Sequence, residues 1–163
     1  MMRKLILFLL VIPIFGNAQK LSELRTDYPL ASKEVAVTEE LFNELSSISK
    51  EDEASLVAYK GAVLTLKAKF AQSLKSKKTY FEQGAELLEH AVETKPDNIE
   101  IRCLRLSVQE NAPKIVGYRK AISEDRQFIL DNYRAVKDLE VKKFIKGFVM
   151  VSKAFNETEK QLF

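Results

Sequence analysis

Glycine and proline are scarce in this chain, and this scarcity limits its fold more than any other feature. The 163 residues include five glycines and four prolines. An antiparallel β protein of this size needs many tight turns, which use glycine, proline and asparagine at defined positions. Alanine, leucine, lysine and glutamate, which favour helices, are abundant instead. The composition therefore predicts an all-α fold.

Small and apolar residues recur at helical spacing along the chain. Over 53–74 they lie three or four positions apart, and most are small, which lets a neighbouring helix approach closely. The same spacing predicts helices over 79–94 and 139–156, and an earlier helix that Thr38 caps. The residues expected to face inward are Val57, Gly61, Leu64, Ala68, Ala71, Phe81, Gly84, Leu88, Ala91, Val92, Phe144, Ile145, Phe148, Ser152 and Phe155.

Prolines mark several of the expected helix boundaries. Pro29 should either kink a helix or begin one, because its ring fixes the backbone and it lacks an N–H donor. Pro96 should end the helix before it, after which Asp97 acts as N-cap in a capping box with Glu100. Pro113 should start a further helix. The apolar residues between these prolines alternate in part, so a strand over 99–108 is the alternative; helix is favoured because an isolated strand would lack a partner.

The N-terminus has the layout of a secretory signal peptide. Basic residues precede an apolar run from Leu5 to Phe15, and small residues follow at 16 and 18. A membrane anchor is the alternative, but a spanning helix needs about 20 apolar residues and this run is shorter. The sequence therefore predicts a signal peptide over 1–18 and a single exported domain over 19–163. That domain is expected to be periplasmic or secreted, without stable insertion in the membrane.

The charge balance argues against a nucleic-acid partner. The formal net charge of the chain is +3, and removing Arg3 and Lys4 with the leader lowers it to +1. Strong binding to nucleic acids requires clustered positive charge. The densest cluster is "KSKK" at 75–78, which we interpret as a solvated turn between helices.

Residue types that carry catalysis or bind metals are sparse. His90 is the only histidine and Cys103 the only cysteine. One of each cannot supply a transition-metal site of the usual kind, and a histidine-based triad has no support in the nearby sequence. His90 is expected at the surface or in helix packing, and Cys103, which has apolar neighbours, in the interior. The sequence predicts neither enzyme activity nor a cofactor.

Polar residues after Pro96 form the candidate binding site. Arg102, Arg105 and Gln109 lie three and four positions apart and share one helix face, and Tyr118 follows in the next segment. Paired arginines can hold the carboxylate of a peptide through bidentate hydrogen bonds. The alternative is a solvated face with a salt-bridged turn, which needs no ligand.

The run "YFEQGAELLEHAVETKPDN", residues 80–98, resembles the second helix and exit turn of a tetratricopeptide repeat (TPR). Gly84 and Ala91 fall at the small positions, Leu88 at the large apolar position and Pro96 at the terminal proline. The preceding helix departs from the pattern, with Ala68, Gln72 and Lys75 where a large apolar, a small and a tyrosine residue are expected. The resemblance implies helical hairpins stacked as a short, degenerate TPR-like array; the alternative is an irregular helical bundle.

A second resemblance concerns where the protein acts. The ending "GNAQ" and the segment "RLSVQENAPKIVGYRKAISEDRQFI" are similar to stretches of uncharacterised exported proteins of Bacteroidetes. This similarity implies export and no particular activity.

These observations favour a non-catalytic module that binds a protein or peptide partner in the cell envelope. The alternative function is a carrier of an apolar small molecule in a helical cavity. The residues expected to line such a cavity are Phe128, Phe144, Phe148 and Phe155.

Overall fold

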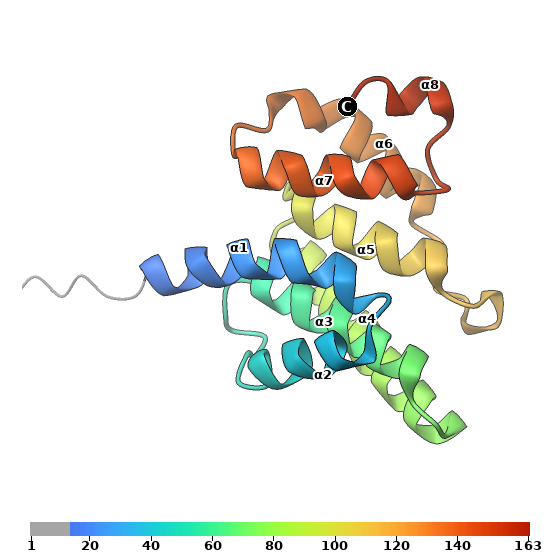
Figure 1. Cartoon of the computed structure of the whole chain (residues 1–163). Helices are drawn as coiled ribbons and strands as arrows, with labels where there is room; N and C mark the ends of the chain where they lie inside the picture. The colour runs from blue at the N-terminus through green and yellow to red at the C-terminus, as the bar shows by residue number, and fades with distance from the viewer. Residues whose placement is uncertain (1–13) are drawn as a thin grey trace, which may run out of the picture.

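The computed structural model describes residues 14–163, which form helices joined by short connections (Figure 1). The α-helices are α1 Ile14–Ala31, α2 Val35–Glu44, α3 Ala54–Phe70, α4 Leu74–Thr94, α5 Ile99–Asn111, α6 Ile122–Asn132, α7 Leu139–Val151 and α8 Glu157–Lys160; the 3-10 turns are η1 Lys114–Val116 and η2 Tyr133–Ala135. The all-α prediction is confirmed, and the strand interpretation of 99–108 is wrong. The predicted signal peptide, 1–18, lies mostly outside the described residues, and its expected cleavage point after Ala18 falls within α1.

Helices that follow one another in the sequence pack together as α1 with α2, α3 with α4, and α5 with α6. α5 lies between the α3–α4 hairpin and α7, and α1 crosses this stack and contacts both α3 and α7 (Figure 1). In an open array of repeats, each unit contacts only its neighbours. Contact between the first and seventh helices is the arrangement expected of the alternative, an irregular bundle. The TPR-like array stays a prediction.

α3 and α4 form a hairpin whose close packing depends on small residues. Gly61 and Gly84 face each other, and the backbone of each contacts the other helix. The inward faces predicted for these helices are confirmed at the buried positions Val57, Gly61, Leu64, Ala68, Gly84, Leu88, Ala91 and Val92. Ala71 lies just past the end of α3 and is only partly buried.

The lysine cluster at 75–78 lies in the first turns of α4, so its assignment to a turn between helices is wrong. Ser73 is the N-cap, and its Oγ accepts a hydrogen bond of 3.0 Å from the backbone N–H of Ser76. This bond satisfies one of the N–H groups that are unpaired at a helix start, and it lets α4 begin before the cluster.

Two predicted helix caps are also wrong. Asn98, and not Asp97, caps α5, because its Oδ1 accepts a hydrogen bond of 2.9 Å from the backbone N–H of Glu100. Thr38 lies inside α2 and is buried, and its Oγ1 donates a hydrogen bond of 2.7 Å to the carbonyl of Ala31. Thr38 therefore joins α2 to the end of α1 and does not begin a helix.

The prolines mark boundaries less uniformly than predicted. Pro29 lies inside α1, close to its end, so it does not begin a helix. Lys95 is the C-cap of α4, which confirms that this helix stops before Pro96. Pro113 precedes only the 3-10 turn η1, which Gly117 ends with a left-handed φ of 67°. The next α-helix, α6, begins after this turn and not at Pro113.

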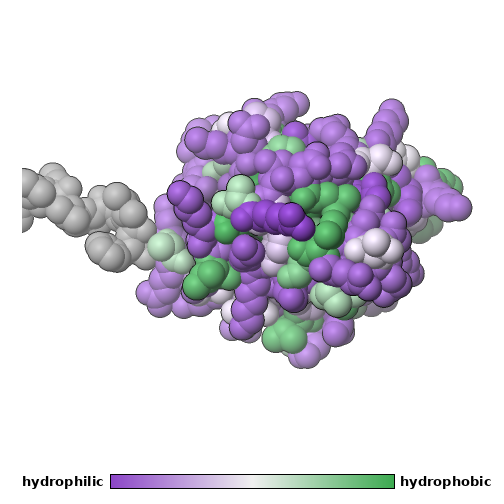
Figure 2. Space-filling view, turned by 90° about the horizontal axis from the view of Figure 1, so that it is seen from above, coloured by the Kyte–Doolittle hydropathy of each residue, from purple (hydrophilic) through white to green (hydrophobic). Residues whose placement is uncertain are grey.

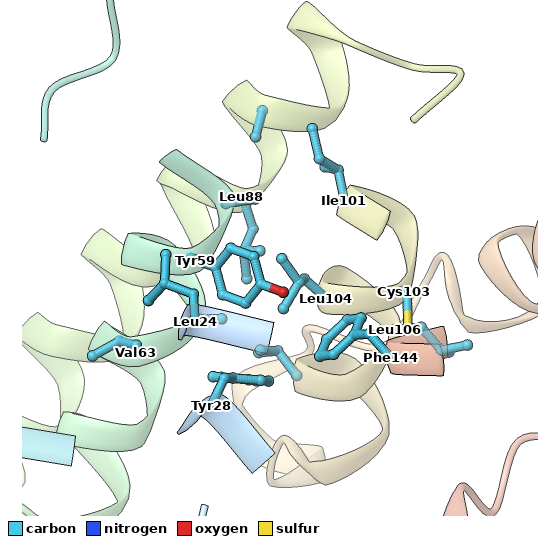
Figure 3. Packing of buried hydrophobic residues seen from close by; sticks show 14 of the residues in the cluster. Leu24, Tyr28, Tyr59, Val63, Leu88, Ile101, Cys103, Leu104, Leu106 and Phe144 are labelled. Carbon is cyan, nitrogen blue, oxygen red and sulfur yellow. The ribbon is translucent and has the colours of Figure 1, made fainter. Parts of the chain in front are cut away.

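The core is centred on α3, which is buried on several sides because α1, α2, α4 and α5 all contact it. In Figure 3, the ring of Tyr59 lies among Leu24, Leu88 and Leu104, which come from α1, α4 and α5. Cys103 is fully buried, as predicted. None of the helices within residues 14–163 combines the length and the apolar character needed to cross a membrane.

α7 packs one face onto this core. Phe144 and Ile145 are buried as predicted, and Phe148 is partly buried. Ser152 and Phe155 are buried as well, although both follow the end of α7. The inward-facing pattern therefore extends past the helix into the segment that leads to α8.

Candidate functional site

Arg105 is held in the interior by carboxylates of the same chain. Its side chain is 6% exposed and that of Asp125 is 0% exposed. Arg105 Nε donates to Asp125 Oδ2 and Arg105 Nη2 donates to Asp125 Oδ1, both at 2.7 Å. Arg105 Nη1 donates to Glu89 Oε2 at 2.8 Å. Burial opposes the charge of Arg105, but the hydrogen bonds and charge of Asp125, followed by Glu89, raise its pKa.

Arg102, one turn earlier on α5, also binds Asp125. We call Arg102, Arg105, Glu89, Glu124 and Asp125 the arginine cluster. Its Nη1 donates to Asp125 Oδ1 at 3.0 Å and also pairs with Glu124. Its Nε donates to the carbonyl of Pro96 at 3.0 Å, and its guanidinium lies 5.0 Å from the ring centroid of Phe128. The hydrogen bond from Arg102 lowers the pKa of Glu124. Arg102 therefore fixes the turn before α5 and the start of α6.

Tyr118 and Gln109 complete the set of predicted site residues. Tyr118 donates from its hydroxyl to Glu89 Oε1 at 2.6 Å, and its ring meets the ring of Phe81 edge-on, with centroids 5.7 Å apart. Burial raises the pKa of Tyr118, and the hydrogen bond and charge of Glu89 raise it further. Gln109 is buried, and its Oε1 has no hydrogen-bond partner within residues 14–163.

The structure thus brings Arg102 and Arg105 together at Asp125, and Arg105 and Tyr118 together at Glu89. Three nitrogens of Arg105 already donate to carboxylates within the chain. The bidentate geometry that was expected to hold a peptide carboxylate is occupied by Asp125. We therefore assign the arginines a positioning role: they tie α4, α5 and α6 together, and Glu89, which Arg105 binds, also holds Tyr118 beside α4.

A second buried ionic cluster was not predicted from the sequence. Arg25 of α1 donates from Nε and Nη2 to the two carboxylate oxygens of Glu100 on α5, at 2.8 and 2.9 Å. Tyr59 of α3 donates from its hydroxyl to the same carboxylate at 2.8 Å. Arg25 Nη1 also reaches Glu140 Oε2 on α7 at 3.2 Å. The cluster therefore joins α1, α3 and α5 at the carboxylate of Glu100, and Arg25 links it to α7 through Glu140.

A large groove lies elsewhere on the described part of the molecule. A groove of about 1730 Å³ is lined by α1, the end of α3, the first half of α4, the second half of α5, the loop 113–118 and α7. α7 and the α3–α4 hairpin lie on opposite sides of α1 (Figure 1). Tyr118 lines the groove, whereas Arg102, Arg105 and Gln109 do not. The predicted site therefore meets the groove at one residue.

Exposed apolar side chains gather at this groove. Ile115 is 95% exposed and Val151 79% exposed, and both line it. Leu74 and Val116 are also exposed, large and apolar, and line it too. On the face shown in Figure 2, hydrophilic residues cover most of the surface and hydrophobic residues form separate patches between them. Large apolar side chains left in water around one concavity are typical of a binding surface.

Basic side chains also line the groove. Six lysines line it together with three glutamates: Lys33, Lys69, Lys77, Lys78, Lys143, Lys153, Glu82, Glu110 and Glu140. All six lysines are exposed. The groove therefore combines apolar contact area with an excess of positive charge.

Possible metal ligands do not converge in the described part of the chain. Within residues 14–163, no group of three or more histidine, cysteine or acidic side chains has the geometry to hold a metal ion. His90 is partly buried, and its Nε2 lies 3.1 Å from the carbonyl oxygen of Lys50 in the connection between α2 and α3. Burial raises the pKa of Cys103 well above its usual value, so its thiol stays protonated.

Comparison of the chain with protein-family models, curated proteins and solved structures finds no match. The likeness to a tetratricopeptide repeat rests on residues 80–98 alone. Functional inference therefore depends on the groove and on the two clusters that hold its walls in place.

Proposed function

We propose that the protein is a non-catalytic binding module whose groove receives a segment of another protein. The observation that carries this proposal is that Leu74, Ile115, Val116 and Val151, all large, apolar and exposed, line one groove. These residues come from α4, η1 and α7, which are far apart in the sequence. Their convergence leaves apolar surface in water, and a partner segment that covers it gains free energy.

The size of the groove favours a segment of protein over a small molecule. Pockets for small molecules measure about 300–1,000 Å³, and this groove measures about 1730 Å³. A helix about 10 Å wide that rises about 1.5 Å per residue fills roughly 120 Å³ per residue. The groove therefore matches about 15 residues of helix, or about four turns. Binding an amphipathic helix in an apolar groove is a common mode of peptide recognition.

The two ionic clusters support this function by fixing the groove's walls. Arg25 lines the groove and is bound to Glu100 and Glu140, so α1 is held against α5 and α7. Tyr118 also lines the groove and is bound to Glu89 on α4. A pre-organised surface loses little conformational entropy when a partner binds, and affinity increases accordingly.

The carrier of an apolar small molecule is the competing proposal. Of the four phenylalanines expected to line its cavity, Phe144 and Phe148 line the groove. Phe128 lies instead under the guanidinium of Arg102, and Phe155 packs against Phe163, with ring centroids 5.7 Å apart. Native mass spectrometry of gently purified protein separates the two proposals, because a carrier retains its ligand.

The protein-binding proposal is tested by crosslinking followed by binding measurements. A photoreactive amino acid at position 115 should capture a partner from envelope extract, and one at position 139 should not. Leu139 is the matched control, since it is 79% exposed on α7 but does not line the groove. The captured protein is then purified and titrated against wild type and two variants at Gly147.

Gly147 lines the groove, and a Cβ added there meets no atom within 4 Å. Gly147→Phe should therefore fill the groove without disturbing the core and weaken binding at least about tenfold, which is about 1.4 kcal/mol. Gly147→Ala should bind as wild type does. Equal affinity for wild type and Gly147→Phe would overturn the proposal, as would a small molecule retained in the groove.

A further inference from the structure

We propose that the segment received by the groove is an acidic amphipathic helix, with carboxylates on both flanks of its apolar face. This inference rests on the proposed function and specifies the partner's chemistry. It is carried by the distribution of charge around the groove. Lys69, Lys77 and Lys78 come from the α3–α4 hairpin, whereas Lys143 and Lys153 come from α7 and the residues just after it. Figure 1 shows these two regions on opposite sides of α1.

Two of the three glutamates of the groove, Glu110 and Glu140, form no ion pair with these lysines. Glu140 is bound by Arg25 at 3.2 Å, and Glu110 accepts a hydrogen bond of 2.6 Å from Ser152. Glu82 pairs with Lys78 at 3.7 Å, within one helix. Each glutamate is therefore engaged by a neighbour, and only one of the six lysines is paired.

The other lysines of the groove lack carboxylate partners within residues 14–163. Lys69 donates to the backbone carbonyl of Ser32 at 2.6 Å and forms no ion pair there. The same described residues provide no salt bridge for Lys33, Lys77, Lys143 or Lys153, all of which are exposed. Positive charge on both sides of an apolar surface attracts a partner with negative charge on both sides.

This arrangement selects among occupants that carry negative charge. A single-chain amphiphile has one charged headgroup, which can meet the lysines on only one side. A helix of about four turns places side chains on both flanks of its apolar face, so it can meet lysines on both sides. Nucleic acid would leave the exposed side chains of Ile115 and Val151 without an apolar partner. The acidic helix satisfies the apolar and the charged parts of the groove together.

The test uses defined helical peptides of about 15 residues, the length that the groove matches. The peptides share one leucine-rich face and carry glutamate, glutamine or lysine on both flanks; a fourth has the glutamate flanks and a central proline. Fluorescence anisotropy measures the affinity of each at low and moderate salt. The glutamate peptide should bind about tenfold more tightly than the glutamine peptide, the lysine peptide should bind most weakly, and added salt should reduce the difference.

Charge-reversal variants of the protein provide the matched comparison. Lys77→Glu combined with Lys143→Glu should abolish the preference for the glutamate peptide. Lys75→Glu combined with Lys120→Glu changes the net charge equally at exposed positions outside the groove, so the preference should remain. Circular dichroism of both double variants checks that the helices persist.

The possible outcomes separate the charge of the partner, its helical conformation and the proposed function. Equal binding of the glutamate, glutamine and lysine peptides overturns the charge inference and leaves the proposed function standing. If the proline-containing peptide binds as tightly as the glutamate peptide without proline, the inference that the partner is helical is wrong. If an anionic fatty acid binds the groove and displaces every peptide, both the acidic helix and the proposed function fail.

Discussion

Gly61 and Gly84 bring the backbones of α3 and α4 into direct contact. A Cβ built on Gly84 would lie 2.5 Å from the carbonyl oxygen of Gly61 and 2.8 Å from Cγ2 of Thr65. A Cβ built on Gly61 would lie 2.7 Å from the carbonyl oxygen of Gly84. Backbone atoms cannot yield as a flexible side chain can, so neither position has room for another residue. The central hairpin of the bundle therefore depends on both glycines.

Gly84→Ala should consequently destabilise the protein. The added methyl group must push α3 and α4 apart, and overpacking of this kind costs about 1–3 kcal/mol. Urea denaturation followed by circular dichroism measures the change in the free energy of unfolding. Gly147→Ala is the control and should raise the free energy of unfolding. Its Cβ meets nothing within 4 Å, and alanine is more favourable than glycine in a helix by about 0.5–1 kcal/mol. A Gly84→Ala variant as stable as wild type would contradict the close contact.

Removing the carboxylate of Asp125 should be the most damaging change in the arginine cluster. Asp125→Ala leaves Arg105 buried without its bidentate partner and removes one partner of Arg102. Loss of one member of a buried ion pair costs about 3–5 kcal/mol. Asp131→Ala, at an exposed position on the same helix, should change stability by less than about 0.5 kcal/mol. Similar unfolding midpoints for the two variants would show that the arginine cluster contributes little to the stability of the fold.

Alkaline pH should destabilise the fold through its buried tyrosines. Burial raises the pKa of Tyr28 from 10.0 to about 12, although its hydrogen bond with Ser107 lowers it in part. Burial also raises the pKa values of Tyr59 and Tyr118. The folded state holds these protons more tightly than the unfolded chain does. For Tyr28, the stabilisation is complete below a pH of about 10 and is lost as the pH rises toward about 12.

Urea titrations across this pH range measure the effect. Each such tyrosine should lower the free energy of unfolding by up to about 1.4 kcal/mol per pH unit between its two pKa values. The Tyr28→Phe variant should lose stability less steeply than wild type over the same range. Parallel slopes for wild type and Tyr28→Phe would rule out a contribution from Tyr28.

The thiol of Cys103 should react only when the protein opens. Cys103 borders the groove, but its side chain is 0% exposed. Burial raises the pKa of its thiol, and the charge of Glu100 raises it further. In the native protein, the reaction of Cys103 with a thiol reagent should therefore be limited by unfolding that exposes the thiol. The Asp125→Ala variant should react faster because it is less stable. Native reaction as fast as in urea-unfolded chain would mean that the thiol is accessible.

The parts of the fold that depend on local spacing could be predicted from the sequence. Small residues three and four positions apart identified the facing sides of α3 and α4, and Pro96 identified the end of α4. Caps were harder to assign, because Asp97 and Asn98 are both good cap residues and lie side by side. Thr38 has the right type for a cap, but it bonds instead to a buried carbonyl that belongs to the end of α1.

The two ionic clusters and the groove depend on contacts between helices, which local sequence spacing does not reveal. Arg105 lies on a polar face of α5 in the sequence pattern, yet it is buried, because it forms hydrogen bonds with Asp125 of α6 and Glu89 of α4. Glu100 was expected to form a capping box with Asp97, but its carboxylate instead accepts hydrogen bonds from Arg25 and Tyr59. The groove arises only where α1, α4, α5 and α7 meet. The one local signal for it is "KIVG", which places apolar residues in a loop.

The contact between α1 and α7 also sets an order for assembly. α1 leaves the ribosome long before α7, yet Ser22 and Arg25 of α1 bind Glu140 of α7 at 3.1 and 3.2 Å. Contacts between residues so distant in sequence form late, because a long loop must close first. Both helices also line the groove, so an unfinished chain has no complete groove. Binding of a partner would thus be restricted to molecules whose synthesis and folding are complete.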